Sequence, residues 1–275
     1  MATYKEIHGV KVQYRDSDAT AIEGDVWYNS ATGALKMYAA LGAWSSGGNL
    51  TTGRKSHGSA GTQTANLVYG GDGPTASQAI SETYDGSSWT EVADLNTARR
   101  CGSGLGTQTA AIQAGGSPVP DQAIVETYNG TSWTEIADLN TARDAGAGSV
   151  GITTAGLIVG GTPGLANAET WNGTAWTEVA DMNNNAQRRG GAGSSNTEGI
   201  VIGGLVDPPV TANTEQWDGS SWTEVANLST ARYGPGGTSA GTASTVAIAA
   251  GGHPSRLQAT EEWDVSASVE TIAFD

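Results

Sequence analysis

ETYDGSSWTEVADLNTAR (82–99), ETYNGTSWTEIADLNTAR (126–143) and ETWNGTAWTEVADMNNNAQR (169–188) are three copies of one segment. Each copy follows an apolar run that ends in a glycine pair. Five such pairs are separated by 45, 45, 43 and 48 residues, and they begin at Gly70, Gly115, Gly160, Gly203 and Gly251. A period of this length, rich in Gly and Trp, is typical of propeller blades. The repeat therefore predicts an all-β fold of tandem sheets.

Each repeat divides into four expected strands. In the second copy these strands are residues 101–106, 109–114, 124–128 and 132–136. Asn129-Gly130 favours the tight turn of a hairpin. The glycine pair ends the second strand, where positive φ or close backbone approach is easiest for glycine. The linker ADLNTAR (137–143) leads to the next repeat.

The composition of the 275-residue chain favours a single domain, residues 1–275, and excludes several functions. A net charge of −15 opposes binding to nucleic acid and to anionic membranes. Membrane insertion is not expected, because the apolar runs are far shorter than the roughly 20 residues that span a bilayer. The N-terminus lacks the pattern of a signal peptide, which predicts a protein that stays in the producing cytoplasm. Cys101 is the single cysteine, so no intrachain disulfide is expected.

The order of parts in each copy resembles the kelch repeat. These parts are a glycine pair, a Tyr-Asp-Gly or Tyr-Asn-Gly turn, a Trp five residues after the aromatic, and an Arg ten residues later. The resemblance covers about residues 42–265 and includes five tandem matches. It implies a β-propeller built from four-stranded antiparallel blades.

The two ends of the chain leave the number of blades open. Residues 43–54 align with the fourth strand and linker of the other copies, and three more strands are expected at 11–15, 25–29 and 34–39. We predict that these strands make a sixth blade. The alternative is a five-bladed ring in which residues 1–40 form a separate arm or attachment segment. In the last copy Ser268 and Val269 replace the expected Trp, and about 269–274 are expected to complete the blade.

A second resemblance concerns residues 23–48, EGDVWYNSATGALKMYAALGAWSSGG. This segment is similar to one found in bacteriophage tail-fibre and virion-associated proteins. Together with the opening MATYKEI and the repeats, it resembles kelch-like proteins of marine tailed phages. The resemblance implies a virion protein.

Residues that recur in every blade serve what every blade needs, so we interpret three repeated positions as scaffold. We expect the arginines to bond carbonyls or repeat glutamates, and the tryptophans to pack between blades. The alternatives are a ring of arginines that captures an acidic ligand and tryptophans that stack on sugars. The positions are Arg54, Arg99, Arg143, Arg188 (or its neighbour Arg189) and Arg232; Glu82, Glu126, Glu169, Glu215 and Glu261; and Trp44, Trp89, Trp133, Trp176 and Trp222.

The loops after the glycine pairs differ most between copies. In a propeller these loops emerge on one face, and a rigid frame that carries variable loops commonly binds ligands there. Neutral drift of surface loops would give the same variation. The candidate ligand-binding residues are Asp72, Pro74, Gln78, Pro118, Asp121, Pro163, Leu165, Asp207, Pro208, His253 and Arg256.

Little in the sequence indicates catalysis. The three histidines are scattered without metal-ligand spacing, so neither a metal nor another cofactor is expected. Cys101 follows two arginines that could lower its pKa, but no His or Asn partner is evident, which favours an idle thiol. Paired carboxylates of a glycosidase cannot be placed from the sequence.

Our first hypothesis is a non-enzymatic, virion-associated binding protein. Its variable loops would contact a host surface glycan, a host protein or another virion protein. The first alternative is a propeller enzyme that hydrolyses surface polysaccharide. The second is a self-assembling fibre or decoration protein that forms homo-oligomers through its N-terminal segment.

Overall fold

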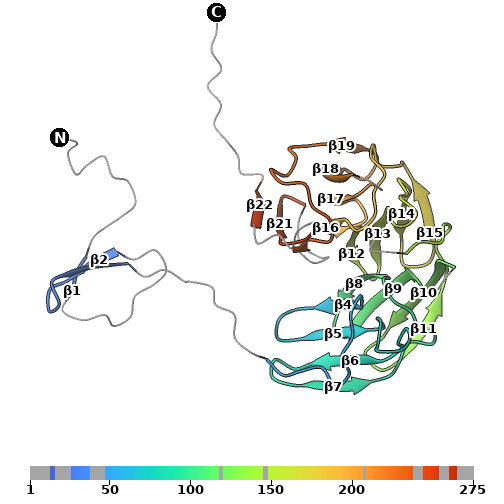
Figure 1. Cartoon of the computed structure of the whole chain (residues 1–275), viewed down its shortest axis with the longest axis horizontal. Coiled ribbons are helices and arrows are strands. Elements are labelled where there is room, and N and C mark those ends of the chain that lie inside the picture. The colour runs from blue at the N-terminus through green and yellow to red at the C-terminus, as the bar shows by residue number, and fades with distance from the viewer. Residues whose placement is uncertain are drawn as a thin grey trace, which may run out of the picture. The chain divides into compact units, whose positions relative to one another are not determined.

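The structure is a computed structural model that describes residues 13–15, 26–37, 47–117, 120–144, 148–206, 209–237, 244–253 and 260–264. The chain divides into two compact units, Met1–Ser46 and Gly47–Asp275. The described residues form strands, turns and loops, as Figure 1 shows. They include no helix, and hence no helix suited to crossing a membrane. The all-β prediction is confirmed.

The first unit contains a three-stranded sheet of β1 (Gln13–Arg15), β2 (Val26–Asn29) and β3 (Ala34–Met37). Asn29 closes the β2–β3 hairpin, because its side-chain oxygen accepts the backbone N–H groups of Ala31 and Thr32 at 3.0 Å. β2 and β3 pair antiparallel, whereas β1 pairs parallel with β2. The described strands of this unit thus differ from the antiparallel order expected of a sixth blade. Trp44 lies outside the described residues.

The second unit contains five antiparallel sheets, the first four with four strands and the fifth with three described strands. The sheets comprise β4 (Gly58–Gly61), β5 (Asn66–Tyr69), β6 (Ser81–Tyr84) and β7 (Trp89–Val92); β8 (Ser103–Thr107), β9 (Ala110–Gly116), β10 (Gln122–Tyr128) and β11 (Trp133–Ile136); β12 (Gly148–Ile152), β13 (Ala155–Val159), β14 (Ala168–Trp171) and β15 (Trp176–Val179); β16 (Gly190–Ser195), β17 (Glu198–Leu205), β18 (Val210–Trp217) and β19 (Trp222–Glu224); and β20 (Gly236–Gly237), β21 (Val246–Ala250) and β22 (Thr260–Asp264).

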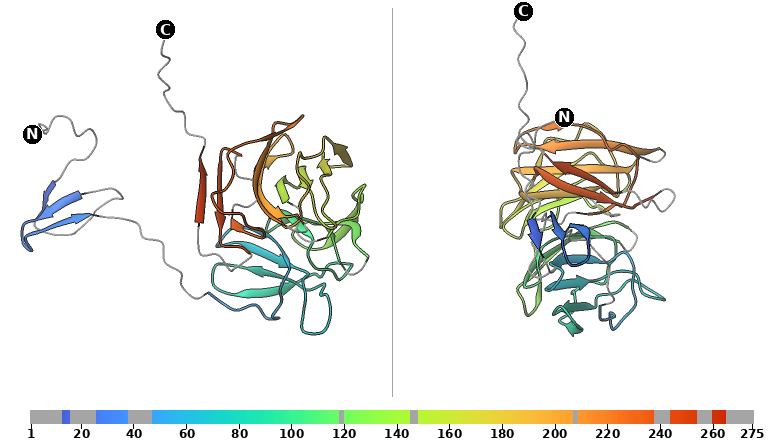
Figure 2. Two further views of the ribbon diagram at one scale, coloured as in Figure 1. Left: turned by 45° about the horizontal axis from the view of Figure 1, so that its top comes forward. Right: turned by 90° about the vertical axis from the view of Figure 1, so that its left-hand side faces the viewer.

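Successive sheets of the second unit contact each other through their first strands. β4 contacts β8, β8 contacts β12, β12 contacts β16, and β16 contacts β20 and β21. In Figure 1 these strands lie towards the middle of the unit, and the fourth strands β7, β11, β15 and β19 lie at its outside. Figure 2 shows the twist of the same sheets from two other directions. This arrangement is consistent with a β-propeller.

The glycine pair is needed where the linker crosses the end of the second strand. Gly70 has φ 63°, and a Cβ there would lie 2.6 Å from the carbonyl oxygen of Arg99. The N–H of Gly71 donates to that same oxygen at 2.9 Å. Both left-handed backbone and the absence of a side chain are therefore required. The repeat keeps the pair because each linker approaches its sheet in this way.

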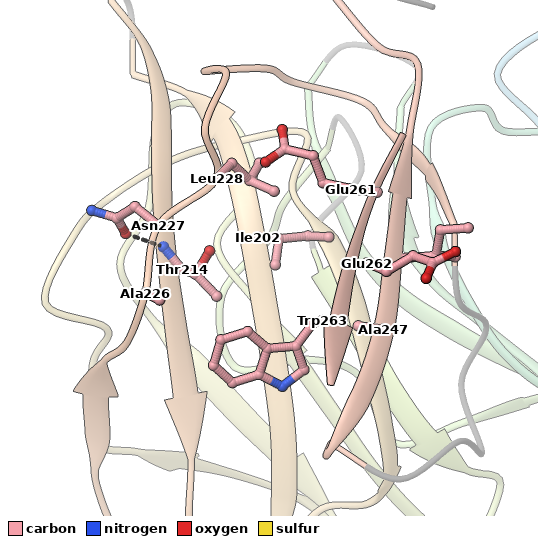
Figure 3. Close-up of a pocket in the computed structure, with 11 residues that line it drawn as sticks. Ile202, Thr214, Ala226, Asn227, Leu228, Ala247, Glu261, Glu262 and Trp263 are labelled. Carbon is pink, nitrogen blue, oxygen red and sulfur yellow. Dashed lines mark hydrogen bonds between the residues drawn. The ribbon is translucent and has the colours of Figure 1, made fainter. Parts of the chain in front are cut away.

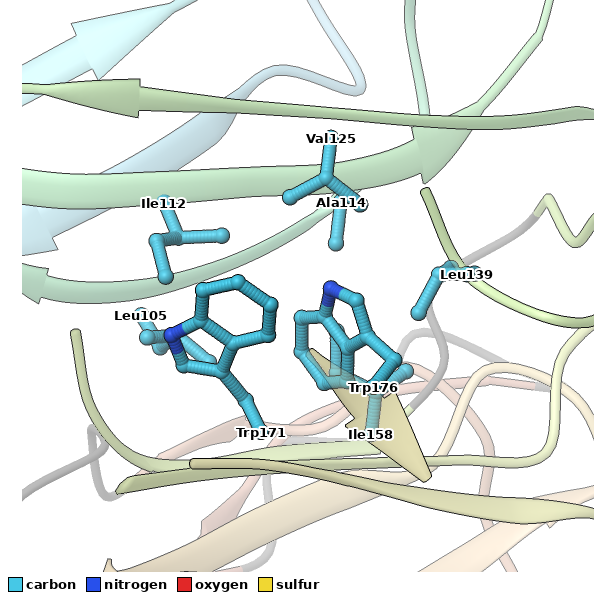
Figure 4. Close-up of a cluster of buried hydrophobic side chains, with 8 residues drawn as sticks. All are labelled: Leu105, Ile112, Ala114, Val125, Leu139, Ile158, Trp171 and Trp176. Atoms are coloured by element: carbon cyan, nitrogen blue, oxygen red, sulfur yellow. The ribbon is translucent and has the colours of Figure 1, made fainter. Parts of the chain in front are cut away.

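Hydrophobic clusters fill the spaces between neighbouring sheets. Figure 4 shows the indoles of Trp171 and Trp176, on β14 and β15, beside Ile112 and Val125 of the preceding sheet. Their ring centroids lie 5.2 Å apart. Trp133 and Trp222 occupy the corresponding places in the second and fourth sheets, and both are buried. Trp89, in the first sheet, is only partly buried.

Among the described residues, no fourth-strand tryptophan equivalent to Trp176 or Trp222 lies between the fourth and fifth sheets. A pocket of about 170 Å³ lies there, with Ile202 and Trp263 beside the open space in Figure 3. Ile202 and Leu228 correspond to Val159 and Met182, which contact Trp222 one sheet earlier. The expected final strand, residues 269–274, lies outside the described residues.

Candidate functional site

Buried ion pairs attach each linker to the sheet that follows it. The side chains of Arg99 and Glu126 form an ion pair and are fully buried. Glu126 also accepts backbone N–H groups of the same linker, from Asn96 at 2.7 Å and Thr97 at 3.3 Å. The arrangement repeats with Arg54–Glu82, and with Arg143–Glu169 and Arg232–Glu261 at 2.6 Å. In the structure these arginines bind their own scaffold, so they do not form a ring of free cations.

The fourth linker departs from this pattern, and the prediction that Arg188 occupies the repeated arginine position is wrong. Ala186 occupies the backbone position of the repeated arginine, because its carbonyl oxygen faces Gly160 as that of Arg99 faces Gly70. Arg189 supplies the guanidinium instead. Its Nη2 lies 2.9 Å from the carbonyl oxygen of Asn184 and 3.7 Å from the Glu215 carboxylate.

The Arg189–Glu215 ion pair is longer than the corresponding pairs in the other linkers, and Arg189 makes fewer hydrogen bonds to the described residues. The side chain of Arg189 is fully buried, yet its Nε and Nη1 atoms have no hydrogen-bond partner among the described residues. Burial lowers the pKa of Arg189, against the opposing effect of Glu215. Buried donors of this kind are normally satisfied by protein, water or ligand.

The Arg–Glu pairs make stability depend on acidic pH. Burial opposes ionisation of Glu82 and Glu261, but hydrogen bonds from Thr51 and Ser229 and the neighbouring arginines outweigh it, so both pKa values fall below 4.5. Because the folded state holds these carboxylates ionised, their stabilisation is present above pH 4.5 and is lost as the pH falls through the lowered pKa values. We expect the free energy of unfolding, measured with denaturant, to fall below pH 4.5. Glu82→Gln should flatten this decline, and an unchanged slope would contradict the assignment.

In the four linkers where the structure describes it, the second residue after the linker arginine position adopts left-handed backbone. Its φ is 55° at Ser56, 54° at Cys101, 56° at Arg188 and 58° at Gly234. For residues other than glycine this conformation costs about 1–2 kcal/mol. Glycine in the fifth repeat shows the residue that the backbone alone would favour. Outliers of this kind concentrate at functional sites.

These left-handed positions meet at one pocket of about 510 Å³, which we call the four-sheet pocket. It receives residues that directly precede the first strands of the first, second, fourth and fifth sheets, together with His253, which follows β21. The lining residues are Ser56, His57, Cys101, Gly102, Arg188, Arg189, Tyr233, Gly234 and His253.

Three side chains form a stack at the four-sheet pocket. The guanidinium of Arg188 lies 5.6 Å from the ring centroid of Tyr233, and this ring stacks on His253 at 4.8 Å with an 11° angle between planes. The backbones of Tyr233 and His253 are joined by hydrogen bonds of 3.2 and 3.0 Å. The stack therefore combines a held cation with aromatic surfaces.

Cys101 is not an activated thiol. Burial, followed by the charge of Asp144, raises its pKa. The neighbouring Arg100 forms an ion pair with Asp72 at 3.0 Å, and its smaller influence does not reverse the shift. The expectation that flanking arginines could lower the Cys101 pKa is therefore wrong.

The predicted loop residues fall into separate places. His253 lines the four-sheet pocket, whereas Asp72 and Pro74 line another pocket of about 430 Å³ with Lys55 and Arg100. Gln78 and Leu165 hold their loops through backbone hydrogen bonds to Gly71 and Gly161. Pro163 is exposed, and Asp121 is partly buried. Pro118, Asp207, Pro208 and Arg256 lie outside the described residues.

The described residues contain no group of three or more His, Cys, Asp or Glu side chains able to hold a metal ion. No protein-family model matches the chain, and no curated protein matches it. The site is therefore interpreted from its own geometry.

Sequence reasoning missed the four-sheet pocket. Only His253 belongs to a variable loop after a glycine pair. The other lining residues follow the linker arginines, in a part of the repeat that we interpreted as scaffold. One signal was present in the sequence: Ser56, Cys101 and Gly234 differ in side chain although each lies two residues after a repeated arginine. Aligning the linkers by backbone position, with Ala186 beneath Arg143, would have added Arg188 to this series.

Proposed function

We propose that the chain is a non-enzymatic, virion-associated binding protein that contacts a host surface glycan. Its second unit is proposed to be a closed five-bladed kelch-like ring, and residues 1–46 an attachment segment. The parallel β1–β2 pairing and the boundary after Ser46 support this version over a sixth blade. The phage context rests on the resemblance of residues 23–48 to tail-fibre segments.

One observation carries the binding role. Four sheets contribute to a single pocket, and the side chains that line it differ from repeat to repeat although the ion pairs beneath them are repeated. A uniform frame with individual residues at its meeting point is typical of binding proteins. The pocket volume of about 510 Å³ lies within the range of small-ligand sites.

Binding to host envelope tests this role, and exchange of loops tests the added part that the sequence predicts for the variable loops, of which only His253 lines the four-sheet pocket. We expect exchange of residues 72–79 with 162–167, the loops after the first and third glycine pairs, to weaken binding to host envelope fractions about tenfold or more. The measurement is co-sedimentation of the pure protein with those fractions. Exchange of residues 85–88 with 129–132 is the matched control, because these turns are similar and join the third and fourth strands.

The control exchange should leave binding unchanged. Binding to neither host envelope nor purified virion proteins would contradict the proposed function. Equal binding by the two exchanged proteins would contradict the part assigned to the loops after the glycine pairs.

A second candidate function, hydrolysis of surface polysaccharide, has one observation in its favour. Burial, followed by the charge of Asp144, raises the pKa of Asp121. Two neighbouring carboxyl groups, one of them with a raised pKa, are the groups that a glycosidase uses. Release of reducing ends from host polysaccharide, abolished in Asp121→Asn, would establish this activity in place of simple binding.

A further inference from the structure

We propose that the four-sheet pocket binds a carboxylated sugar unit, with the exposed Arg188 receiving the carboxylate and the buried Arg189 adding positive charge. This inference rests on the proposed glycan-binding function and names the chemical class of its ligand. It assigns Arg188 as the residue that determines specificity for the acidic sugar.

The charge of the pocket is opposite to that of the chain. The protein carries a net charge of −15, yet the lining includes two arginines and no Asp or Glu among the described residues. Asp144, whose backbone pairs with Thr162 beyond the third sheet's β13, acts on Cys101 but does not line the pocket. A cationic pocket in an acidic protein favours an anionic group and disfavours neutral sugars.

Arg189 adds positive charge at the pocket, because its own ion pair is looser than those of the other linkers. Its side chain is fully buried and lines the pocket, and its Nε and Nη1 atoms lack a partner among the described residues. In the other linkers the guanidinium is held close to its glutamate, at 2.6 Å in Arg143–Glu169, whereas Arg189 lies 3.7 Å from Glu215. The ligand carboxylate is therefore expected to bind the exposed guanidinium of Arg188, since the Arg189 donors are buried.

Arg188 occupies its position against the preference of the backbone. Its φ of 56° matches the 58° of Gly234, where the fifth repeat has glycine. The side chain is exposed and reaches over Tyr233, so it does not contribute to the core. Retaining arginine in left-handed backbone is explained by what the guanidinium does in the pocket.

The rest of the pocket suits a sugar ring. A volume of about 510 Å³ accommodates a unit of monosaccharide size. Ser56 and Tyr233 provide hydroxyl groups for sugar hydroxyls, and the exposed ring of His253 offers a flat surface. These features add neutral contacts to the two cations, and they favour a uronic acid over a simple inorganic anion.

The test titrates the full-length protein with glucuronate, glucose and inorganic phosphate. Binding is measured by calorimetry and by NMR chemical-shift changes of the residues that line the pocket. We expect saturable glucuronate binding, with no binding of glucose and much weaker binding of phosphate. Arg188→Gly should weaken glucuronate binding about tenfold or more. Its thermal midpoint should be unchanged or raised, because glycine relieves the left-handed strain. Arg100→Gln, which removes a cation held by Asp72 outside this pocket, should bind as the parent does.

Three results would overturn the inference. These are equal binding of glucose and glucuronate, equal binding of phosphate and glucuronate, and unchanged affinity in Arg188→Gly. Failure of the proposed function is distinguished by envelope binding. If glucuronate does not bind but loop exchange still abolishes attachment to host envelope, the ligand class is wrong and the binding role stands.

Discussion

Glu126→Ala should destabilise the protein by about 3–5 kcal/mol, because it leaves the buried guanidinium of Arg99 without its counter-charge. Arg99 and Glu126 both have a relative exposure of 0%. The substitution also removes the acceptor for the backbone N–H groups of Asn96 and Thr97. Several buried donors therefore lose one partner together, and desolvated groups of this kind are costly when unpaired. Denaturant unfolding of the purified protein measures the effect.

Glu135→Ala is the matched control for this substitution. Glu135 lies directly opposite Glu126 in the β10–β11 ladder, but it is exposed. Removing its carboxylate should change the free energy of unfolding by less than about 0.5 kcal/mol. If the two variants were equally stable, the ion pair would not hold the linker to the second sheet in the way the structure indicates.

The sequence predicted the architecture well because the same physical requirement recurs in every repeat. The glycine pair at Gly70 and Gly71 is the clearest case, since the close linker carbonyl excludes any side chain. The second-copy strands also lie near their expected positions, and β10 pairs with β11 across the Asn129-Gly130 turn. Alternation of apolar strand segments with turn residues is a local feature of the sequence, so strands and hairpin turns can be predicted directly from it.

The fourth linker shows where such reasoning fails. We assigned the nearest arginines, Arg188 or Arg189, to the repeated position, but the residue ten positions after Trp176 is Ala186. The backbone position belongs to Ala186, and the guanidinium comes from Arg189 further along the chain. The linker keeps its length, so the arginine has changed place while the carbonyl has not. The antiparallel pairing expected of the N-terminal strands is also not found. The position of a strand in the sequence does not determine whether β1 pairs parallel or antiparallel with β2.

The four-sheet pocket could not be predicted because its parts are far apart in the chain. Ser56 and His253 are brought together only by the packing of successive sheets. Left-handed backbone at Cys101 and Arg188 is also invisible in the sequence, since neither residue type favours it. The repeat does show which positions are constant, and the site consists mainly of the positions that are not.

Trp176→Ala should lower stability by about 3–5 kcal/mol, because the indole fills the space between the second and third sheets. Trp176 is buried and packs with Leu139 and Ile158 (Figure 4). Trp89→Ala is the matched control from the same repeat position. The effect of the control should be clearly smaller, because Trp89 is only partly buried. Denaturant unfolding measures both variants.

Replacement by phenylalanine separates the packing of these indoles from their hydrogen bonds. The Nε1 of Trp222 donates to the carbonyl oxygen of Ala180 at 2.9 Å, whereas that of Trp176 has no partner among the described residues. Trp176→Phe therefore loses volume alone, and it also removes a buried donor that the folded state leaves unpaired. Trp222→Phe should be the more destabilising of the two by about 1 kcal/mol, the net contribution of one hydrogen bond. If instead Trp176→Phe were as damaging as Trp176→Ala, close fit of the indole, and not the mass of apolar side chain, would hold the second and third sheets together.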